Sequence, residues 1–547
     1  MNSRIRLGYP GFGLVFCVIG VALGACSTSD DELSGAAPCA DSDPECKVGG
    51  AGGGTDPPPG GTGGEPTHTG LAGAGGDGNG YFDSTEAGGG GIEIPAGCMG
   101  VEQSPRIFYM SADDSNSMGS PAHARELIHI GFEPNPYRIR TYEFLNYYRI
   151  AYTAPEYGKL ELYPELETKT DDPAVAEFQL GVRSFDALVP RRPMNLVFLI
   201  DTSGSMKGPG MDRAKAAVKA IASMLVAGDT VSIIASDTTL DKLDGHSVTG
   251  PNDPMLLSHL DTLKTGGKAD LYTALGDAYS LAKKYDNESL MSRVILISDG
   301  GVNAGVTSTD LIKDKSADAD KEGIYLIGVG TGPALSYDDQ LMNDVTDAGR
   351  GAYVYLDSVE EATRIFTERF DETMDVAARN VQVEVTLPWY FKVKGISTEE
   401  ISEKPVTAQH LAPNDAMVFN LEITACDPSV YDLEDNVRIR AFWKTRVGNL
   451  DQVTEANVPL KSLKSSIAPA LPKGRAIVAF AEALKGCESN TQSNGPCVTE
   501  ADRKQITKEK LALARNLSVA ANPSGNDPEL NEIISLIDNH PLLVTGL

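Results

Sequence analysis

The chain has 547 residues, more than one domain usually holds, and 41% of them are hydrophobic, so a sizeable core can form. It carries 76 acidic against 47 basic residues, a formal net charge of -29. Because this charge repels the phosphate backbone, the composition excludes nucleic acid as an expected partner.

The first 25 residues have the pattern of an export signal. Arg4 and Arg6 precede an apolar stretch that ends in Leu23-Gly24-Ala25-Cys26. This ending resembles a bacterial lipobox, which implies cleavage before Cys26, lipid on its sulfur, and an extracytoplasmic protein anchored to a membrane. Ser27 after the cysteine favours the outer membrane under the enteric sorting rule. Ordinary signal cleavage or a short membrane anchor is the alternative.

Residues 26–103 are rich in glycine, proline and aspartate. Such a composition does not bury enough apolar surface to offset the entropy of ordering, so it predicts a flexible tether. About 50 residues of this kind reach roughly 40 Å, enough to hold a domain away from a membrane surface.

Export also permits disulfide bonds. Without the signal and the lipidated cysteine, six cysteines remain, and six allow 15 connectivities. Proximity in the sequence favours two local pairs and leaves one long-range pair: Cys39 with Cys46, Cys487 with Cys497, and Cys98 with Cys426. No histidine lies near these cysteines at the spacing of a zinc site.

Residues 104–190 form an N-terminal flanking segment with helices followed by strands. The pattern predicts short helices over 122–130 and 141–148. Polar and apolar residues then alternate over 159–163 and 178–182, which is typical of strands with one solvent-exposed face.

Residues 191–376 alternate buried strands with amphipathic helices. This pattern predicts an α/β fold, a Rossmann-like, doubly wound and mostly parallel sheet with the strand order 3-2-1-4-5-6. The expected strands are Leu196–Ile200, Val231–Ala235, Val294–Ile297, Ile324–Val329 and Ala352–Leu356. A closing helix is expected from Val359 to Phe370.

Residues 377–547 combine strands and helices in a second flanking segment. Half-buried strands are expected over 381–387, 416–423 and 437–443, and helices over 475–484, 504–517 and 528–538. Since alternating strands lie on both sides of the α/β unit, the simplest arrangement is one β-rich domain built from both flanks, with the α/β domain inserted in it.

Polar residues follow the first buried strand of the α/β domain. Asp201, Ser203 and Ser205 form a D-x-S-x-S pattern, and their hard oxygen donors suit Mg²⁺. Asp299 follows the strand predicted to lie beside it. The two carboxylates therefore converge where open α/β sheets bind ligands, and a divalent cation would remove their mutual repulsion.

Three motifs resemble the von Willebrand factor type A domain, in bacterial forms that are often lipoproteins: residues 201–205, 297–303 and 324–330. The resemblance implies a metal-ion-dependent adhesion site. Ser203 and Ser205 would bind Mg²⁺ directly, with Mn²⁺ or Ca²⁺ as alternatives. Asp201 and Asp299 would bind it directly or through water. A carboxylate from an unidentified protein partner would complete the coordination.

One loop departs from the family pattern. Where the family has a threonine in a Gly-Gly-Thr-Asp-Leu-like loop, this chain has Ala269, with Lys268 inserted before it. The loss of this hydroxyl should weaken metal binding or change the coordination geometry, although Asp270, Thr265 or water could replace it. A degenerate site without metal is therefore an alternative.

The expected function is a protein-interaction module rather than an enzyme. A metal-free envelope scaffold is one alternative, and a metal-dependent hydrolase, which would want more carboxylates, is another. A nucleotide cofactor is not expected, because Gly328 to Gly332 lack the G-x-G-x-x-G spacing and Asp201 occupies the position of a pyrophosphate. No G-x-S-x-G hydrolase motif and no P-loop occur.

Overall fold

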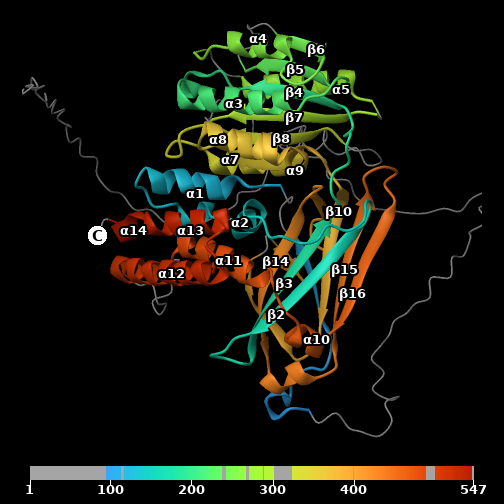
Figure 1. The fold of residues 1–547 in the computed structure, drawn as a ribbon, viewed down its shortest axis with the longest axis vertical. Helices are drawn as coiled ribbons and strands as arrows, with labels where there is room; N and C mark the ends of the chain where they lie inside the picture. The colour runs from blue at the N-terminus through green and yellow to red at the C-terminus, as the bar shows by residue number, and fades with distance from the viewer. Residues whose placement is uncertain are drawn as a thin grey trace, which may run out of the picture. The chain divides into compact units, whose positions relative to one another are not determined.

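The computed structural model describes residues 94–111, 116–236, 242–266, 270–287, 289–300, 323–397, 400–487 and 499–544. The predicted signal and most of the predicted tether lie outside these ranges. Among the helices of the described residues, none combines the length and the apolar character needed to span a membrane. The described residues form an α/β sheet, two antiparallel sheets and a set of helices from both flanks (Figure 1).

The α/β sheet has the strand order β6-β5-β4-β7-β8-β9. Counted along the chain this is 3-2-1-4-5-6, so the predicted order is confirmed. All neighbours pair in parallel except β6, which is antiparallel to β5 at one edge. The bounds are β4 Met194–Ile200, β5 Thr230–Ala235, β6 Leu243–Ser247, β7 Met291–Ser298, β8 Tyr325–Gly330 and β9 Arg350–Tyr355.

Strand β6 was not predicted. Its sequence, LDGHS, contains no apolar run, and none of its residues is buried. An edge strand needs a partner on one side only, so its residues can stay partly exposed and give no hydrophobic signal.

Helices cover both faces of the α/β sheet. Because crossovers between parallel strands are right-handed and the order reverses at β4, α3 and α7 lie on opposite faces. α3 packs against α4 and α8, and α5 packs against β4, β5 and β7. The bounds are η3 Gly204–Met206, α3 Pro209–Ser223, α4 Pro254–Thr262, α5 Leu271–Tyr285 and α7 Asp339–Gly349.

The closing helix is not the single helix that the sequence predicts. α8 (Val359–Thr363) leads into a π-helical turn, η4 (Arg364–Glu368), and then into α9 (Phe370–Met374). The Arg369 N–H donates to the Arg364 carbonyl at 3.1 Å, five residues back. The wider turn lets both arginines reach Tyr147 of α2, one its hydroxyl at 2.7 Å and the other its carbonyl at 2.9 Å.

The two antiparallel sheets combine strands from before and after the α/β domain, which confirms the predicted insertion. One has the order β12-β1-β10-β15-β16, with β13 also paired to β10, and the other is β11-β14-β3-β2. The earlier strands are β1 Arg106–Ser111, β2 Leu160–Thr168 and β3 Val175–Ser184. The later strands are β10 Ala378–Leu387, β11 Phe391–Ile396, β12 Glu400–Ser402, β13 Gln409–Leu411, β14 Ala416–Ala425, β15 Asn436–Thr445 and β16 Asp451–Pro459.

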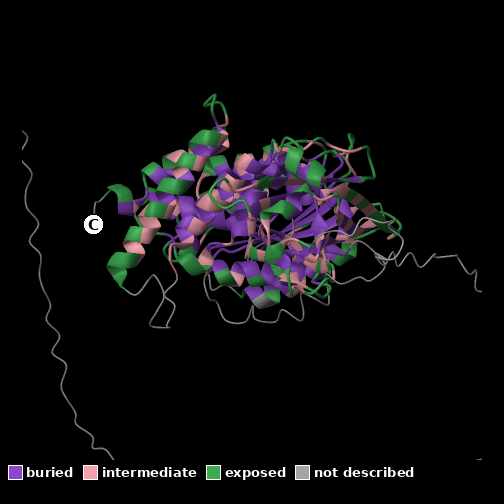
Figure 2. Cartoon of the chain, turned by 90° about the horizontal axis from the view of Figure 1, so that it is seen from below, coloured by how far each residue is buried: buried purple, intermediate pink, exposed green. Residues whose placement is uncertain are grey.

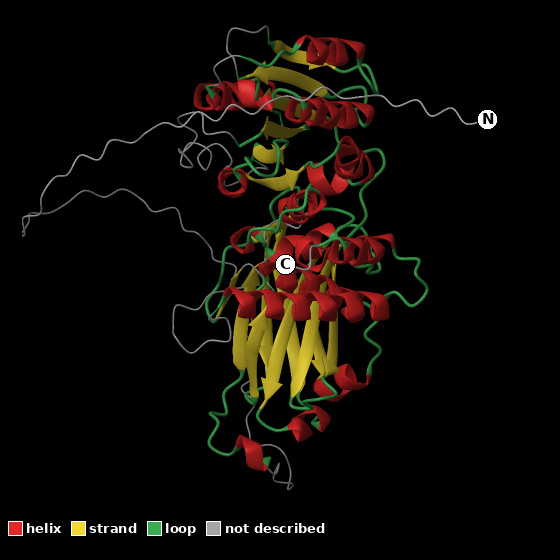
Figure 3. Cartoon of the chain, turned by 90° about the vertical axis from the view of Figure 1, so that its left-hand side faces the viewer, coloured by secondary structure: helices red, strands yellow, loops and turns green. Residues whose placement is uncertain are grey.

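Alternate residues of these strands form a core between the two sheets. Phe178 and Leu180 of β3 and Val385 of β10 are completely buried in it, and Figure 3 shows the strands side by side. Strand β1 precedes the first α-helix, in contrast to the expected order of helices before strands. Its mixed burial, with only the last two residues buried, explains why its sequence shows no strand pattern.

Helices from both flanks share the hydrophobic core of the α/β domain. Phe144 of α2, Phe480 of α11 and Ile533 of α13 belong to the same buried cluster as Leu196 of β4. Figure 2 shows buried residues in the interior of the molecule and exposed residues at its periphery. The bounds are η1 Ala96–Cys98, α1 Gly119–His129, η2 Pro136–Arg138, α2 Thr141–Tyr147, η5 Pro428–Asp432, α10 Leu460–Ser465, α11 Leu471–Lys485, α12 Glu500–Ala521, α13 Pro528–Asp538 and α14 Pro541–Val544.

Candidate metal centre

The two predicted carboxylates follow neighbouring strands. Ile200 and Ile297, the residues at the ends of the β4 and β7 ladder, are register partners. The Asp201 N–H continues this ladder and donates to the Ile297 carbonyl at 2.8 Å. Asp201 and Asp299 therefore lie at the same carboxyl edge of the sheet, next to the point where the strand order reverses.

The Asp201 carboxylate is fully buried and is held by three donors. One oxygen accepts the Ser203 N–H at 2.8 Å and the Ser236 hydroxyl at 3.3 Å. The other accepts the Ser298 hydroxyl at 2.8 Å. Hydrogen bonds to an ionised group are about twice as strong as neutral ones, so this arrangement fixes the orientation of the carboxylate.

The hydroxyls of Ser203 and Ser205 form a hydrogen bond, with their oxygens 2.8 Å apart. Mg²⁺ binds oxygens at 2.0–2.1 Å in an octahedron, so two adjacent ligands are about 2.9 Å apart. The larger Ca²⁺ binds its ligands at longer distances, so adjacent ligands lie farther apart. The serine pair, with a fixed carboxylate beside it, could therefore exchange this hydrogen bond for two contacts to a small hard cation with little change in the separation of its oxygens.

Asp299 lies at the turn after β7, where the backbone is crowded. It is 6% exposed, and a Cβ added at Gly332 would lie 2.6 Å from the Asp299 Cβ. The next residue, Gly300, has φ +70° and packs against the backbone of Asp338. Glycine is therefore needed at position 332, which packs against this aspartate, and at position 300, which follows it in the chain.

Asp270, the further candidate ligand, caps helix α5 through its contact with the Thr273 N–H at 3.0 Å. The hydrogen bonds from Thr273 hold the pKa of this carboxylic acid below its ordinary value. Its own N–H donates to the Ser236 carbonyl, so the backbone borders the site. Ala269 and Lys268, on which the prediction of a degenerate site depends, lie outside the described residues.

Sequence reasoning missed two buried hydroxyls of this site. Ser236 and Ser298 are fully buried, and both contact the Asp201 carboxylate. Each follows or ends a buried apolar strand at the carboxyl edge of the sheet. A polar residue in that position was therefore the signal that could have found them.

The predicted cysteine pairs are described only in part. The structure joins Cys98 and Cys426 in a disulfide, 328 residues apart in the chain. Cys487 is also disulfide-bonded, whereas Cys497, its expected partner, lies outside the described residues. Cys26, the predicted lipidation site, and the expected pair of Cys39 and Cys46 also lie outside them.

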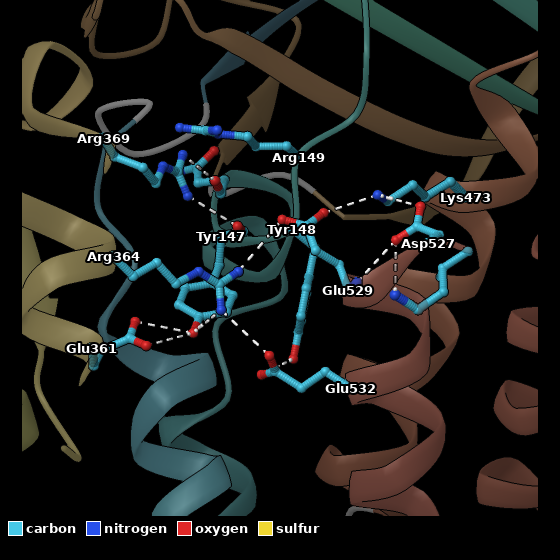
Figure 4. A network of polar contacts seen from close by, with 12 residues as sticks. Tyr147, Tyr148, Arg149, Glu361, Arg364, Arg369, Lys473, Asp527, Glu529 and Glu532 are labelled. Atoms are coloured by element: carbon cyan, nitrogen blue, oxygen red, sulfur yellow. Dashed lines mark hydrogen bonds and ion pairs between the residues drawn. The ribbon is translucent and has the colours of Figure 1, made fainter. Parts of the chain in front are cut away.

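A second polar cluster connects the closing helix to the flanks (Figure 4). The Tyr147 hydroxyl accepts from Arg125 at 2.5 Å and from Arg364 at 2.7 Å, and donates to Glu361. Burial and the Glu361 carboxylate raise the pKa of Tyr147. Arg125 and Arg364 also pair with Glu532 of α13. Arg125 pairs with Glu361 as well, and this pair is nearly buried, so removing one of its partners costs about 3–5 kcal/mol. The cluster therefore fastens α8 to α1 and α2, and the more exposed pairs with Glu532 extend it to α13.

A cavity of about 260 Å³ borders this cluster, and its lining mixes charges of both signs: Arg149, Arg364, Glu368, Arg369, Pro528, Glu529 and Glu532. Within the described ranges, no three residues among histidine, cysteine, aspartate and glutamate are grouped to hold a metal ion. The site at Asp201 is of another kind, because two of its oxygen donors are serine hydroxyls.

The order of the strands and the motif at their carboxyl edge define a von Willebrand factor type A domain. Residues 196–302 match the family model described as von Willebrand factor type A domain, which confirms the resemblance to this domain. The chain therefore contains a domain of this family, inserted in a β-rich domain that also supplies helices.

Several known proteins are similar to this chain. The uncharacterized protein YfbK of Escherichia coli (strain K12) is 25% identical over 314 residues, 55% of this chain and 53% of the relative. The human voltage-dependent calcium channel subunit alpha-2/delta-3 is 31% identical over 156 residues, 27% of this chain and 14% of the subunit. The chain thus spans about half of the first relative and a smaller share of the second.

Among solved structures, the von Willebrand factor type A protein from Catenulispora acidiphila is 14% identical with a TM-score of 0.38. The match covers 78% of this chain and 90% of that chain.

Proposed function

We propose that this chain is a lipid-anchored extracytoplasmic module that binds a protein partner through a divalent cation. The observation that carries the proposal is the pair of serine hydroxyls 2.8 Å apart, next to the buried and oriented Asp201 carboxylate. Ser203 and Ser205 would bind the cation directly, and Asp201 and Asp299 directly or through water. When bound, Mg²⁺ would offer a coordination position to a carboxylate of the partner.

Two further observations support an interaction role. The α/β domain is of the von Willebrand factor type A family, and one relative is named as a subunit of a larger assembly, a voltage-dependent calcium channel. A metal-free envelope scaffold is the second candidate, which the departure at Ala269 favours.

Thermal unfolding of the full chain, purified in detergent, tests the metal site. Ligand that binds only the folded state stabilises it by about 2.7 kcal/mol at a hundredfold excess over the Kd. Circular dichroism in EDTA and then in Mg²⁺, Mn²⁺ or Ca²⁺ should show a higher Tm with a preferred ion. Asp201→Ala should keep the fold and lose this shift. An unchanged Tm with every ion would favour the scaffold.

Membrane fractionation tests the anchor separately. The sequence from Leu23 to Cys26 and the tether behind it support lipidation. We expect Cys26→Ser to move the protein from the membrane fraction to the soluble fraction. If the variant remains with the membranes, the lipid anchor is wrong, whatever the result of the metal experiment.

A further inference from the structure

Large apolar side chains are exposed on two segments next to the candidate metal centre. One is the end of α1 with the loop after it, and the other is the turn between β8 and α7. Four residues define this flank patch, with their exposed fractions: Ile130 47%, Phe132 50%, Tyr137 79% and Leu335 60%. Three of them belong to the N-terminal flank and not to the α/β domain.

Hydrogen bonds connect the two segments to each other beside the metal centre. The Gly332 carbonyl accepts from Arg213 at 3.1 Å and from the Tyr355 hydroxyl at 2.6 Å. Glu126 of α1 accepts from the same arginine, at 2.8 Å, and from the same tyrosine. Since Gly332 itself packs against Asp299, α1 lies one layer of residues away from the predicted metal ligand.

Chain geometry places the flank patch within reach of one partner. Leu335 is three residues from Gly332, at most about 11 Å along the chain. Ile130 is four residues beyond Glu126, about 6 Å along the helix axis. A standard interface covers about 800 Å² on each protein, a disc about 32 Å wide. A protein whose carboxylate reaches the metal would therefore extend over this patch.

We infer that the flank patch is the second half of the partner-binding surface. Its occupant is a protein segment that presents a carboxylate with apolar side chains beside it. The inference rests on the proposed function, because the carboxylate needs the cation. A few well-packed residues near the centre of an interface carry much of its affinity, and a charged contact such as the cation fixes the register of the partner, so the two parts of the surface would act together.

A membrane surface is a poorer occupant for the same residues. Glu133 is exposed in the middle of the loop, and residues 130–137 contain no lysine or arginine, so the loop lacks the basic side chains that anionic headgroups attract. The contacts at Gly332 also place the patch beside the metal centre, and binding to a lipid surface would not require the two to be close.

A displayed library of random 12-residue peptides tests the inference without a known partner. The full chain is immobilised in detergent with Mg²⁺, and bound peptides are eluted with EDTA. We expect the enriched peptides to contain Asp or Glu with apolar neighbours. Fluorescence anisotropy of a synthetic peptide should show at least tenfold weaker binding to Phe132→Asp and to Leu335→Asp.

Met255→Asp is the matched control, because Met255 is 56% exposed. It lies on α4. In the loop before this helix, the Val248 N–H donates to the Asp229 carbonyl at the amino end of β5. Met255 therefore lies near the edge of the sheet opposite the metal centre. This variant should bind the peptide as the wild type does. Circular dichroism of all three variants verifies that they are folded, as expected for exposed positions.

The outcomes separate the two proposals. Peptide binding that needs Mg²⁺ but is unaffected by Phe132→Asp and Leu335→Asp would overturn the flank patch and leave the metal site intact. The absence of any Mg²⁺-dependent peptide would contradict the proposed function, and with it this inference. Flotation with anionic vesicles that Phe132→Asp abolishes would assign the patch to the membrane and overturn it as well.

Discussion

Replacing Ser298 by alanine should separate the support of the metal centre from its ligands. The Ser298 hydroxyl is fully buried, donates to Asp201 at 2.8 Å and accepts the Gly300 N–H at 3.1 Å. In Ser298→Ala, one oxygen of a buried carboxylate loses its donor, and the N–H at the start of the Asp299 turn loses its acceptor. The proposed metal ligands Ser203 and Ser205 remain unchanged.

The magnitudes follow from these two contacts. A hydrogen bond to a charged group contributes about 1.5–3 kcal/mol, so the free energy of unfolding without metal should fall by about this amount. Residues that orient metal ligands typically change metal affinity 10–100-fold, which is about 1.4–2.7 kcal/mol. The stability difference between wild type and Ser298→Ala should therefore grow by that second amount when Mg²⁺ is saturating.

Ser292→Ala provides the control on the same strand. The Ser292 hydroxyl is buried, donates to Asp286 at 2.6 Å and accepts from Asn195 at 3.0 Å, but lies six residues away, about 20 Å along β7. Urea unfolding of each variant, with EDTA and with Mg²⁺, measures the differences. The Ser292→Ala difference should not depend on Mg²⁺. If the Ser298→Ala difference is equally independent of Mg²⁺, the proposal that Ser298 orients Asp201 as a metal ligand is refuted.

Three further predictions concern the turn beside Asp299, the long-range disulfide and the buried histidines. Gly332→Ala should weaken Mg²⁺ binding at least tenfold in a calorimetric titration, because its Cβ would lie 2.6 Å from that of Asp299, whereas Gly276→Ala in α5 has open space and should not. Cys426→Ala should lower the free energy of unfolding in urea by about 2–5 kcal/mol, since it opens the bond to Cys98. Each buried histidine should lower the free energy of unfolding by about 1.4 kcal/mol for every pH unit below 6.5. The reason is that the unfolded chain then binds a proton that the folded chain does not. Burial lowers the pKa of His123, His410 and His540, in the last case to about 4. The urea midpoint measured against pH tests this prediction, and a midpoint that does not change with pH would contradict it.

The sequence was sufficient to predict the α/β sheet because its strands are buried on both faces. All seven residues of β4 are buried, so the strand reads as an apolar run that ends at Asp201. Order and handedness rules then place the strand before Asp299 next to it, as found. Partly exposed elements gave no such signal, and β6 and β1 were missed for that reason.

Contacts between distant segments could not be predicted from one sequence. Arg125 pairs with Glu532, 407 residues away, and with Glu361. A charged residue on a helix usually faces solvent, and nothing in its local sequence shows that a partner from another segment buries it. The π-helical turn at Arg364 has the same origin, since its contacts are with Tyr147 of α2.

The flank packs against the turn that lies behind the candidate metal centre. The turn after β8 begins where the Thr331 N–H donates to the Ser298 carbonyl at 3.0 Å. On its other side, the Ala334 carbonyl contacts His123 of α1 at 3.0 Å, and the Tyr337 carbonyl accepts from Arg138 at 3.0 Å. Packed interiors transmit small shifts because they have few voids. If a cation or a partner displaced Asp299, this turn would be the first element to respond, and α1 and η2 of the flank would follow through the contacts of Ala334 and Tyr337.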